Sequence, residues 1–261
     1  MNREEINVIA DAGRAKADYL GTNPVRYFFR AMVAGGHLMT GTLLSVLAAA
    51  WFYKESMGMA KLLGAFTFSA ALILVVLIGG ELFTGTHFVM GVSLYERRVR
   101  IPEAIRLWGV CFLGNFVGIL ILTAVVAGSG ASRELMTEYL ASTVPGRLHC
   151  GVPALVFKGV MCNFMVCTGV FGGMKLKSEA GKCMAIIPVI TTFVLAGFEH
   201  SVANMATFSL YVFLVPGADI MGCVWNLAWV TLGNILGGAV FLGFPVWMSA
   251  QPAVNEKKPT A

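Results

Sequence analysis

The chain alternates long apolar blocks with short polar segments, and six apolar blocks stand out. A helix needs about 20 apolar residues to cross a bilayer core about 30 Å thick, and four blocks are close to that length. The second and fifth blocks hold about 33 residues each, which a straight helix would extend to roughly 50 Å. Neither has a polar hairpin at its middle. We therefore expect six crossings, with a broken helix in each long block. The blocks are 31–52, 62–94, 107–128, 152–174, 183–215 and 220–248.

The composition indicates an all-α membrane protein. Of the 261 residues, 57% are hydrophobic and only 13% are charged, and the mean hydropathy is +0.76. A soluble domain usually has about 25% charged residues. The low charge therefore excludes an ordinary soluble domain.

The basic residues gather on one side of the predicted bundle. Lys and Arg concentrate in both tails and in the loops after the second and fourth blocks, and few lie in the other loops. Cytoplasmic segments of membrane proteins carry such an excess. We therefore expect both termini in the cytoplasm, and the net charge of +5 requires no nucleic-acid partner. The predicted parts are a cytoplasmic N-terminal segment, 1–30, a six-helix membrane domain, 31–248, and a cytoplasmic tail, 249–261.

The two long blocks share a motif that predicts an internal duplication. GGELFTG in the second block and AGFEHSVAN in the fifth each place a lone glutamate after a glycine, which allows the unusual backbone angles of a break. Glu81 precedes Asn115 of GNFVG by 34 residues. Glu199 precedes Asn234 of GNILGG by 35. Because each half has three crossings, the second enters the membrane from the opposite side, which makes an inverted repeat. The halves are 31–128 and 152–248.

The acids and the histidine of these motifs differ in their expected roles. Glu81 and Glu199 occupy matching positions, which favours caps on the backbone freed at each break over binding of cations or protons. His200 has Leu82 at the matching position. Such an asymmetry within a repeat indicates function, although a hydrogen-bonded core histidine is the alternative. Ionisable groups inside membranes are functional hypotheses by default.

The other buried polar residues leave more than one interpretation open. Lys158 fits a side chain that reaches the membrane interface, or one that lines a path. Asn163 and Asn204 could line a pore or hold the breaks together by hydrogen bonds. His37 and His87 have no supporting pattern, and we expect them to be structural or interfacial.

No pattern for a metal, a cofactor or an enzyme stands out. The six cysteines include no CxxC pair, so neither a disulfide framework nor a metal site is expected. The chain also lacks HExxH, GxSxG and histidine pairs at haem spacing. We therefore expect no cofactor and no enzymatic activity.

Four long motifs resemble the formate/nitrite transporter family, and most closely its nitrite channel branch. They are GELFTG, KGVMCNFMVC, GFEHSVANM and NLAWVTLGNILGGAVFLG, and the resemblance covers about residues 20–248. It implies an aquaporin-like six-helix protomer with its own pore, a homopentamer, and a bacterial cytoplasmic (inner) membrane location. It also implies passage of small monovalent anions such as nitrite, formate and hydrosulfide.

The family's functional positions carry over to particular residues of this chain. The resemblance places the central pore residues at His200, Thr84, Asn163 and Asn204. It places apolar constrictions at Phe68, Phe83 and Val166 toward the outside, and at Leu72 and Phe193 toward the inside. Arg147 stands where the family has a lysine near the outer mouth, and it keeps the positive charge but cannot readily lose a proton.

These residues predict a pathway for weak-acid anions, with nitrite as the first expectation. Arg147, with Lys158 as a second source of charge, attracts the anion. Apolar rings then impose a desolvation cost, and His200 hydrogen-bonds the anion or protonates it transiently. Formate and hydrosulfide are alternative substrates, a proton-coupled carrier is an alternative to a channel, and an aquaporin-like facilitator of neutral solutes is a different interpretation.

Overall fold

The computed structural model describes residues 2–250, and most of them are helical. No β-strand element occurs in that range. The predicted C-terminal tail lies almost entirely outside the described residues. The elements are α1 (Arg3–Thr22), α2 (Pro24–Ala50), α3 (Met57–Ile78), α4 (Phe83–Tyr95), α5 (Ile101–Ser129), α6 (Arg133–Thr143), α7 (Pro145–Leu148), α8 (Val152–Lys175), α9 (Glu179–Leu195), α10 (Ser201–Leu214), α11 (Ile220–Ile235), the π-helix η1 (Leu236–Gly243) and α12 (Phe244–Met248).

Five helical stretches among the described residues are long and apolar enough to cross a membrane. Four of them match the first, third, fourth and sixth apolar blocks, and α3 covers the front part of the second block. The fifth block instead holds α9, with 17 residues, and α10, with 14. The five stretches are Pro24–Ala50, Met57–Ile78, Ile101–Ser129, Val152–Lys175 and Ile220–Met248.

Each long apolar block contains two helices separated by a short non-helical segment. The segment between α3 and α4 includes Gly79 and Gly80, whose φ angles are 108° and 136°. The segment between α9 and α10 includes Gly197, with a φ of 76°. Because side chains disfavour positive φ, glycine is the residue that lets the chain leave a helix at these points.

The two halves of the chain use the same close packing between their first and third long helices. In the first half α2 packs on α5, and a Cβ at Gly118 would lie 2.1 Å from the carbonyl oxygen of Met32. In the second half α8 packs on α11, and a Cβ at Gly233 would lie 2.3 Å from the carbonyl oxygen of Val156. Small residues at such contacts let helix backbones approach closely.

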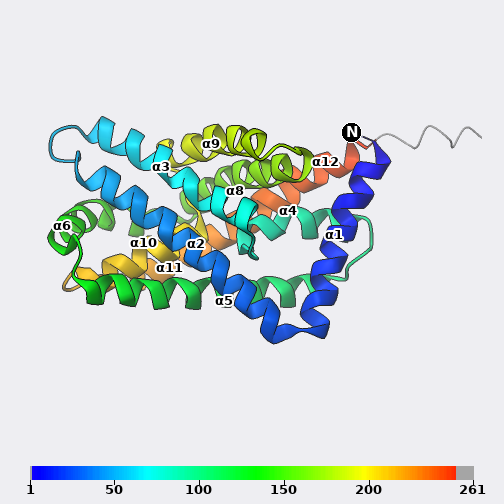
Figure 1. Ribbon diagram of the computed structural model, residues 1–261, viewed down its shortest axis with the longest axis horizontal. Helices are drawn as coiled ribbons and strands as arrows, with labels where there is room; N and C mark the ends of the chain where they lie inside the picture. Colours follow the sequence, from blue (N-terminus) through cyan, green and yellow to red (C-terminus); the bar gives the residue numbers. More distant parts are fainter. Residues whose placement is uncertain (1, 251–261) are drawn as a thin grey trace, which may run out of the picture.

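The elements outside the long helices lie at opposite ends of the bundle. Figure 1 shows α1 running across one end, beside the α4–α5 connection and α12, and α6 at the other end. Glu96, which follows α4, links α1 and α12 at this end. It accepts hydrogen bonds from the Arg3 guanidinium (2.8 Å) and from the Trp247 indole (2.5 Å). Lys175, the last residue of α8, adds another link: its ammonium lies 3.0 Å from the Glu5 carboxylate on α1 and lowers the pKa of that carboxyl.

Candidate functional site

A cavity of about 520 Å³ lies toward the α6 end of the bundle, lined by residues of α2, α3, α6, α8, α9 and α10. His200 is among its lining residues, together with the segment that precedes it. Three cationic side chains line it as well, those of Lys61, Arg147 and Lys158, against one carboxylate, Glu199. The balance of charge in this first cavity is therefore positive.

A second cavity of about 250 Å³ lies toward the α1 end. Its lining includes Lys16 of α1 and the segment between α3 and α4, with Gly80, Glu81 and Leu82. Residues of α3, of α4 and of the end of α8 also line it. The two cavities therefore reach the two helix interruptions from opposite ends of the bundle.

His200 and Thr84 meet where the two interruptions come together. The Thr84 hydroxyl lies 2.8 Å from Nε2 of His200, and both residues are buried. His200 is also the N-cap of α10, and its Nδ1 accepts a hydrogen bond of 3.0 Å from the backbone N–H of Ala203. The neutral imidazole therefore carries its proton on Nε2 and donates it to Thr84. The Phe193 ring stacks on the imidazole, with centroids 6.0 Å apart.

Two asparagines hold the starts of the helices that follow the interruptions. Oδ1 of Asn115 accepts from the backbone N–H of Phe83 at 2.9 Å, and its amide donates to the carbonyl oxygen of Glu81 at 2.8 Å. Oδ1 of Asn234 accepts from the N–H of Ser201 at 2.8 Å, and its amide donates to the carbonyl oxygen of Glu199 at 3.0 Å. The same clamp therefore occurs in both halves, each time from the third long helix.

The expectation that Glu81 and Glu199 cap the freed backbone was wrong. Among residues 2–250 their carboxylates bind side chains. Glu81 accepts from the Lys16 ammonium at 2.6 Å. Glu199 accepts from two nitrogens of Arg147, at 3.1 and 2.6 Å, and from the Asn204 amide at 2.7 Å. The physical reason is that the asparagines already satisfy the backbone, while a buried carboxylate needs a cation nearby.

The expected sides of the apolar constrictions also change. Phe193 was assigned to the side opposite Phe68, yet their rings are in edge-to-face contact with centroids 6.0 Å apart, and both line the first cavity. Phe83 lines neither cavity. Its ring packs against Phe112 at 5.1 Å and His87 at 4.4 Å. Rotamers and neighbours on other helices decide these directions, and the sequence does not display them.

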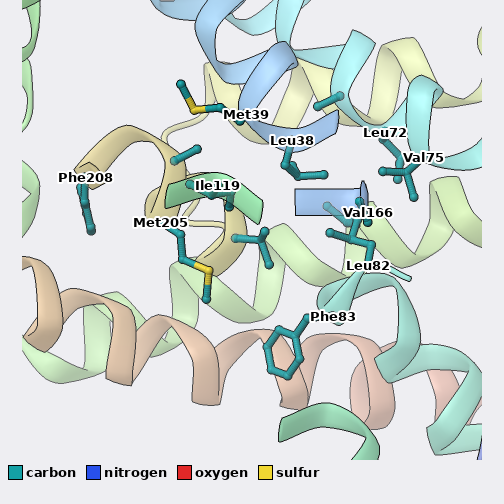
Figure 2. Close-up of a cluster of buried hydrophobic side chains, with 14 of the residues drawn as sticks. Leu38, Met39, Leu72, Val75, Leu82, Phe83, Ile119, Val166, Met205 and Phe208 are labelled. Carbon is teal, nitrogen blue, oxygen red and sulfur yellow. The ribbon is translucent and has the colours of Figure 1, made fainter. Parts of the chain in front are cut away.

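The remaining apolar residues are buried between α3, α4 and α8. Leu72 and Val166 are 3% and 2% exposed. Figure 2 shows them in one cluster with Leu82, and shows the Phe83 ring directed away from Val166 and Leu82. Leu82 borders the second cavity, at the α1 end, whereas Phe83 was expected toward the opposite, outer side.

The other candidate polar residues fall into two groups. Asn204 and Lys158 line the first cavity, and the Lys158 ammonium lies 3.8 Å from the sulfur of Cys150. Asn163 lines neither cavity and is fully buried. Its amide donates to backbone carbonyl oxygens of Thr84, at 3.2 Å, and Asn234, at 2.7 Å. These hydrogen bonds agree with the interpretation in which Asn163 holds the breaks together, and not with the one in which it lines a pore.

The described residues contain no cluster of three or more His, Cys, Asp or Glu side chains that could hold a metal ion. The six cysteines are free thiols, four of them buried. The cavities are therefore bounded by packing, hydrogen bonds and ion pairs.

Comparison with known proteins assigns this arrangement to a family. A family model described as "Formate/nitrite transporter" matches residues 3–248. The chain belongs to the formate/nitrite transporter family. It is 31% identical to "Nitrite transporter NirC" of Escherichia coli (strain K12) over 98% of this chain and 94% of that protein. This member of the family is thus a multi-pass membrane protein of a channel and transporter family, and the family is not enzymatic.

Solved structures resemble this formate/nitrite transporter family member closely. An "FNT family ion channel" superposes with a TM-score of 0.87 at 28% identity, covering 95% of this chain and 99% of that one. A "Pentameric formate channel with formate bound" superposes with a TM-score of 0.74, also at 28% identity, covering 85% and 96%.

Sequence reasoning missed three residues of the site. Lys16, in the polar N-terminal segment, pairs with Glu81 and lines the second cavity, as Arg147 pairs with Glu199 at the first. Lys61 borders the first cavity. Leu82 was considered only as the counterpart of His200, and its place beside the second cavity was not predicted. Extending the comparison of the two halves to the segments before them would have drawn attention to Lys16.

Proposed function

We propose that this protein carries small monovalent anions of weak acids, above all nitrite, across the bacterial cytoplasmic membrane, with His200 as the central group of the path. The observation that carries the proposal is the position of His200. It borders the first cavity and hydrogen-bonds Thr84. Thr84 lies two residues after Leu82, which borders the second cavity. Similarity to a nitrite transporter over 98% of the chain supports nitrite as the first candidate, with formate or hydrosulfide as alternatives.

The proposed arrangement in the membrane has six crossings. α3 with α4, and α9 with α10, each form one broken crossing, and the two halves are related as an aquaporin-like inverted repeat. The matched asparagine clamps and glycine contacts support this arrangement. Both termini lie in the cytoplasm, and five copies assemble, as in the similar pentameric formate channel.

Lysines supply most of the attraction for the anion in this proposal. The charge of Arg147 is largely offset by its two hydrogen bonds to Glu199. Lys61 and Lys158 line the same cavity, and neither has a carboxylate within ion-pair distance among residues 2–250. Uncompensated charge in a cleft raises the local concentration of the opposite ion. Arg147 acts mainly by keeping Glu199 from repelling the anion.

Apolar groups on either side of His200 then impose the main barrier. Phe68 and Phe193 line the first cavity and Leu82 lines the second, while Val166 is buried in the same core cluster as these residues. A bare anion in such a low-dielectric environment is far more costly than its neutral acid or a well hydrogen-bonded ion. The polar groups at His200 therefore determine whether the anion passes.

The N-cap hydrogen bond favours one of the two roles expected for His200. Because Ala203 donates to Nδ1, the proton on Nε2 can be offered to an anion, directly or through the Thr84 hydroxyl, as a hydrogen bond. Full transfer of that proton would leave an anionic imidazole, since Nδ1 cannot be reprotonated while it accepts from Ala203. Hydrogen bonding therefore operates in this conformation, and proton transfer requires the imidazole to turn first.

Replacement of His200 by Asn tests the proposal. Asn is a good N-cap, so the amide oxygen of the new side chain would replace Nδ1 as the acceptor for Ala203, while the Nε2–H donor is lost. Since a hydrogen bond to a charged group contributes about 1.5–3 kcal/mol, nitrite flux into proteoliposomes should fall about 10- to 100-fold. The matched control is His149→Asn, at a histidine whose side chain is 75% exposed. Unchanged flux and an unchanged profile over pH 5 to 8 in His200→Asn would contradict the proposal.

A substrate panel decides between nitrite and the alternatives. Wild-type proteoliposomes are challenged with nitrite, formate, hydrosulfide and chloride, and water permeability is measured by osmotic shock. We expect the fastest saturable flux for nitrite and little flux of water. Rapid water flux with negligible anion flux would identify a facilitator of neutral solutes instead.

A further inference from the structure

Asn226 on α11 is a fully buried polar residue that the proposed pathway does not use. It lines neither cavity. Its amide nitrogen donates to the backbone carbonyl oxygen of Arg147 at 3.1 Å, and its Oδ1 accepts from the amide nitrogen of Asn204 at 2.8 Å. A buried amide is costly unless its polar atoms are paired. Here both ends are paired with residues that line the first cavity.

The matching position in the first half shows that the third long helix does not need a polar residue here. Asn226 lies eight residues before Asn234, the asparagine of the second clamp. Eight residues before Asn115, the asparagine of the first clamp, lies Leu107, which is also fully buried. The amide of Asn226 therefore serves the contacts that it makes, and not the packing of α11.

The first of these contacts anchors the backbone of Arg147. This residue belongs to α7, a helix of four residues that depends on its neighbours for its place. Carbonyl oxygens at the end of a helix have no partner within it, and the Asn226 amide supplies one. The next side chain, Leu148, is fully buried against α11, where a Cβ on Gly222 would lie 2.9 Å from its own Cβ. Asn226 thus adds a polar anchor to an apolar one.

The second contact ties the guanidinium end of Arg147 to the same asparagine. Nη2 of Arg147 donates to Oε2 of Glu199 at 2.6 Å and to Oδ1 of Asn204 at 2.5 Å. The Asn204 amide nitrogen donates to Oε2 of Glu199 at 2.7 Å and to Oδ1 of Asn226 at 2.8 Å. Each nitrogen has one hydrogen for each of these acceptors, so the contacts do not compete. Asn226 therefore closes a ring through Arg147 and Asn204.

The ring controls where Arg147 lies rather than how the Asn204 amide is turned. Arg147 and Glu199 already determine which end of that amide faces each of them. Asn226 adds a fixed separation between the Arg147 backbone and the Asn204 amide, because one short side chain contacts both. An arginine side chain has many rotamers, and that of Arg147 is 35% exposed. Without the ring it can turn toward the cavity and away from the buried carboxylate.

We propose that Asn226 is a positioning residue for the capture of the anion. By holding both ends of Arg147, it keeps the charge of Glu199 compensated at the first cavity. The inference rests on the proposed function, because it concerns the charge balance that attracts the anion. If Arg147 withdraws, the carboxylate is left with an uncompensated negative charge, and such a charge in a cleft lowers the local concentration of an anion.

Replacement of Asn226 by Leu, the residue at the matching position of the first half, removes both contacts with a side chain of similar size. Nitrite flux into proteoliposomes is measured against concentration, at low and at high ionic strength. We expect KM to rise about fivefold at low ionic strength. The maximal flux should change less, because the hydrogen bonds of Asn226 reach neither His200 nor Thr84. The rise in KM should shrink at high ionic strength, because salt screens charges near an open cavity.

A background without the ion pair separates positioning from a purely structural role. In Arg147→Gln/Glu199→Gln no charge remains for Asn226 to hold in place, so adding Asn226→Leu should change KM less than twofold. Gly118→Ala is the control for destabilisation alone, since its added Cβ would lie 2.1 Å from the carbonyl oxygen of Met32 and Gly118 does not line the first cavity. It should leave KM within twofold of the wild type.

Three results would overturn the inference. One is a KM in Asn226→Leu within twofold of the wild type. Another is the same rise in KM in the background without the ion pair, and the third is a rise that high ionic strength leaves unchanged. If Asn226→Leu is not recovered as a folded assembly, Asn226→Ala takes its place with the same expectations. Loss of nitrite flux in the wild type would contradict the proposed function, whereas normal wild-type flux with an unaffected variant contradicts only the inference.

Discussion

The asparagine clamps provide the sharpest test of how the interruptions are held. In Asn115→Leu a side chain of similar size loses every polar contact of the original. Three hydrogen bonds disappear, to the N–H of Phe83 at 2.9 Å and to the carbonyl oxygens of Ala31 at 2.7 Å and Glu81 at 2.8 Å. Asn115 is fully buried, so water does not replace these partners.

The magnitude follows from which of these groups keeps another partner. The carbonyl oxygen of Ala31 lies within α2 and that of Glu81 also accepts from the Cys111 thiol at 3.1 Å, so both remain partly satisfied. The N–H of Phe83 belongs to the first turn of α4, where no helix carbonyl is available. A buried unsatisfied N–H costs about 1–3 kcal/mol, and two weakened carbonyl contacts add about 1 kcal/mol. We expect a total loss of about 2–4 kcal/mol.

Unfolding in mixed micelles with increasing dodecyl sulfate, followed by tryptophan fluorescence, measures this loss. Thr123→Val is the matched control, since Thr123 is equally buried on the same helix but its hydroxyl hydrogen-bonds, among residues 2–250, only the sulfur of Met39 at 3.5 Å. It should cost less than about 1 kcal/mol. Asn234→Leu should cost as much as Asn115→Leu, because it frees the N–H of Ser201 in the same way. A loss at Asn115 no larger than that of the control would refute the clamp.

Two further predictions concern the ion pair and the helix packing. Arg147→Gln leaves the carboxylate of Glu199 buried without its cation and should lower stability in the same assay by about 3 kcal/mol. Arg147→Lys keeps the charge and should recover most of the loss. Equal losses in the two variants would contradict a charge-based role. Gly118→Ala should lower stability by about 1–3 kcal/mol, because the added Cβ would lie 2.1 Å from the Met32 carbonyl oxygen. Gly109→Ala, with nothing within 4 Å of the added Cβ, is its control and should be neutral.

The apolar pattern predicted most of the fold because lipid-facing helices must be apolar along their length. It located α2, α5, α8 and α11, although α2 and α5 begin before their predicted blocks, and the glycines marked the points at which α3 and α9 end. It did not predict α1 and α6. Both are amphipathic or polar helices at the ends of the bundle, and short polar segments between apolar blocks have the same composition whether they are helices or loops.

The site was less predictable because its polar groups meet across long stretches of sequence. The motif comparison found Glu81 and Glu199 and predicted that they cap the backbone freed at each break. A capping partner can, however, come from any element nearby. Here the caps come from the third helix of each half, and the cations come from segments before each half. The direction of the Phe193 side chain likewise depends on its rotamer and on contact with Phe68, which the sequence does not determine locally.

The clamps also give a register in which the two halves can be compared residue by residue. Phe83 and Ser201 are equivalent, since the N–H of each binds an asparagine Oδ1. In that register His200 matches Leu82, which caps α4 without a side-chain hydrogen bond, and Thr84 matches Val202. At these two positions each half has a polar residue where the other has an apolar one, and His200 and Thr84 bind each other across the interruptions. A frame built by repetition thus acquires the contact between Thr84 and His200 from two complementary departures, and position-by-position comparison brings out Thr84 as well as His200 without reference to any relative.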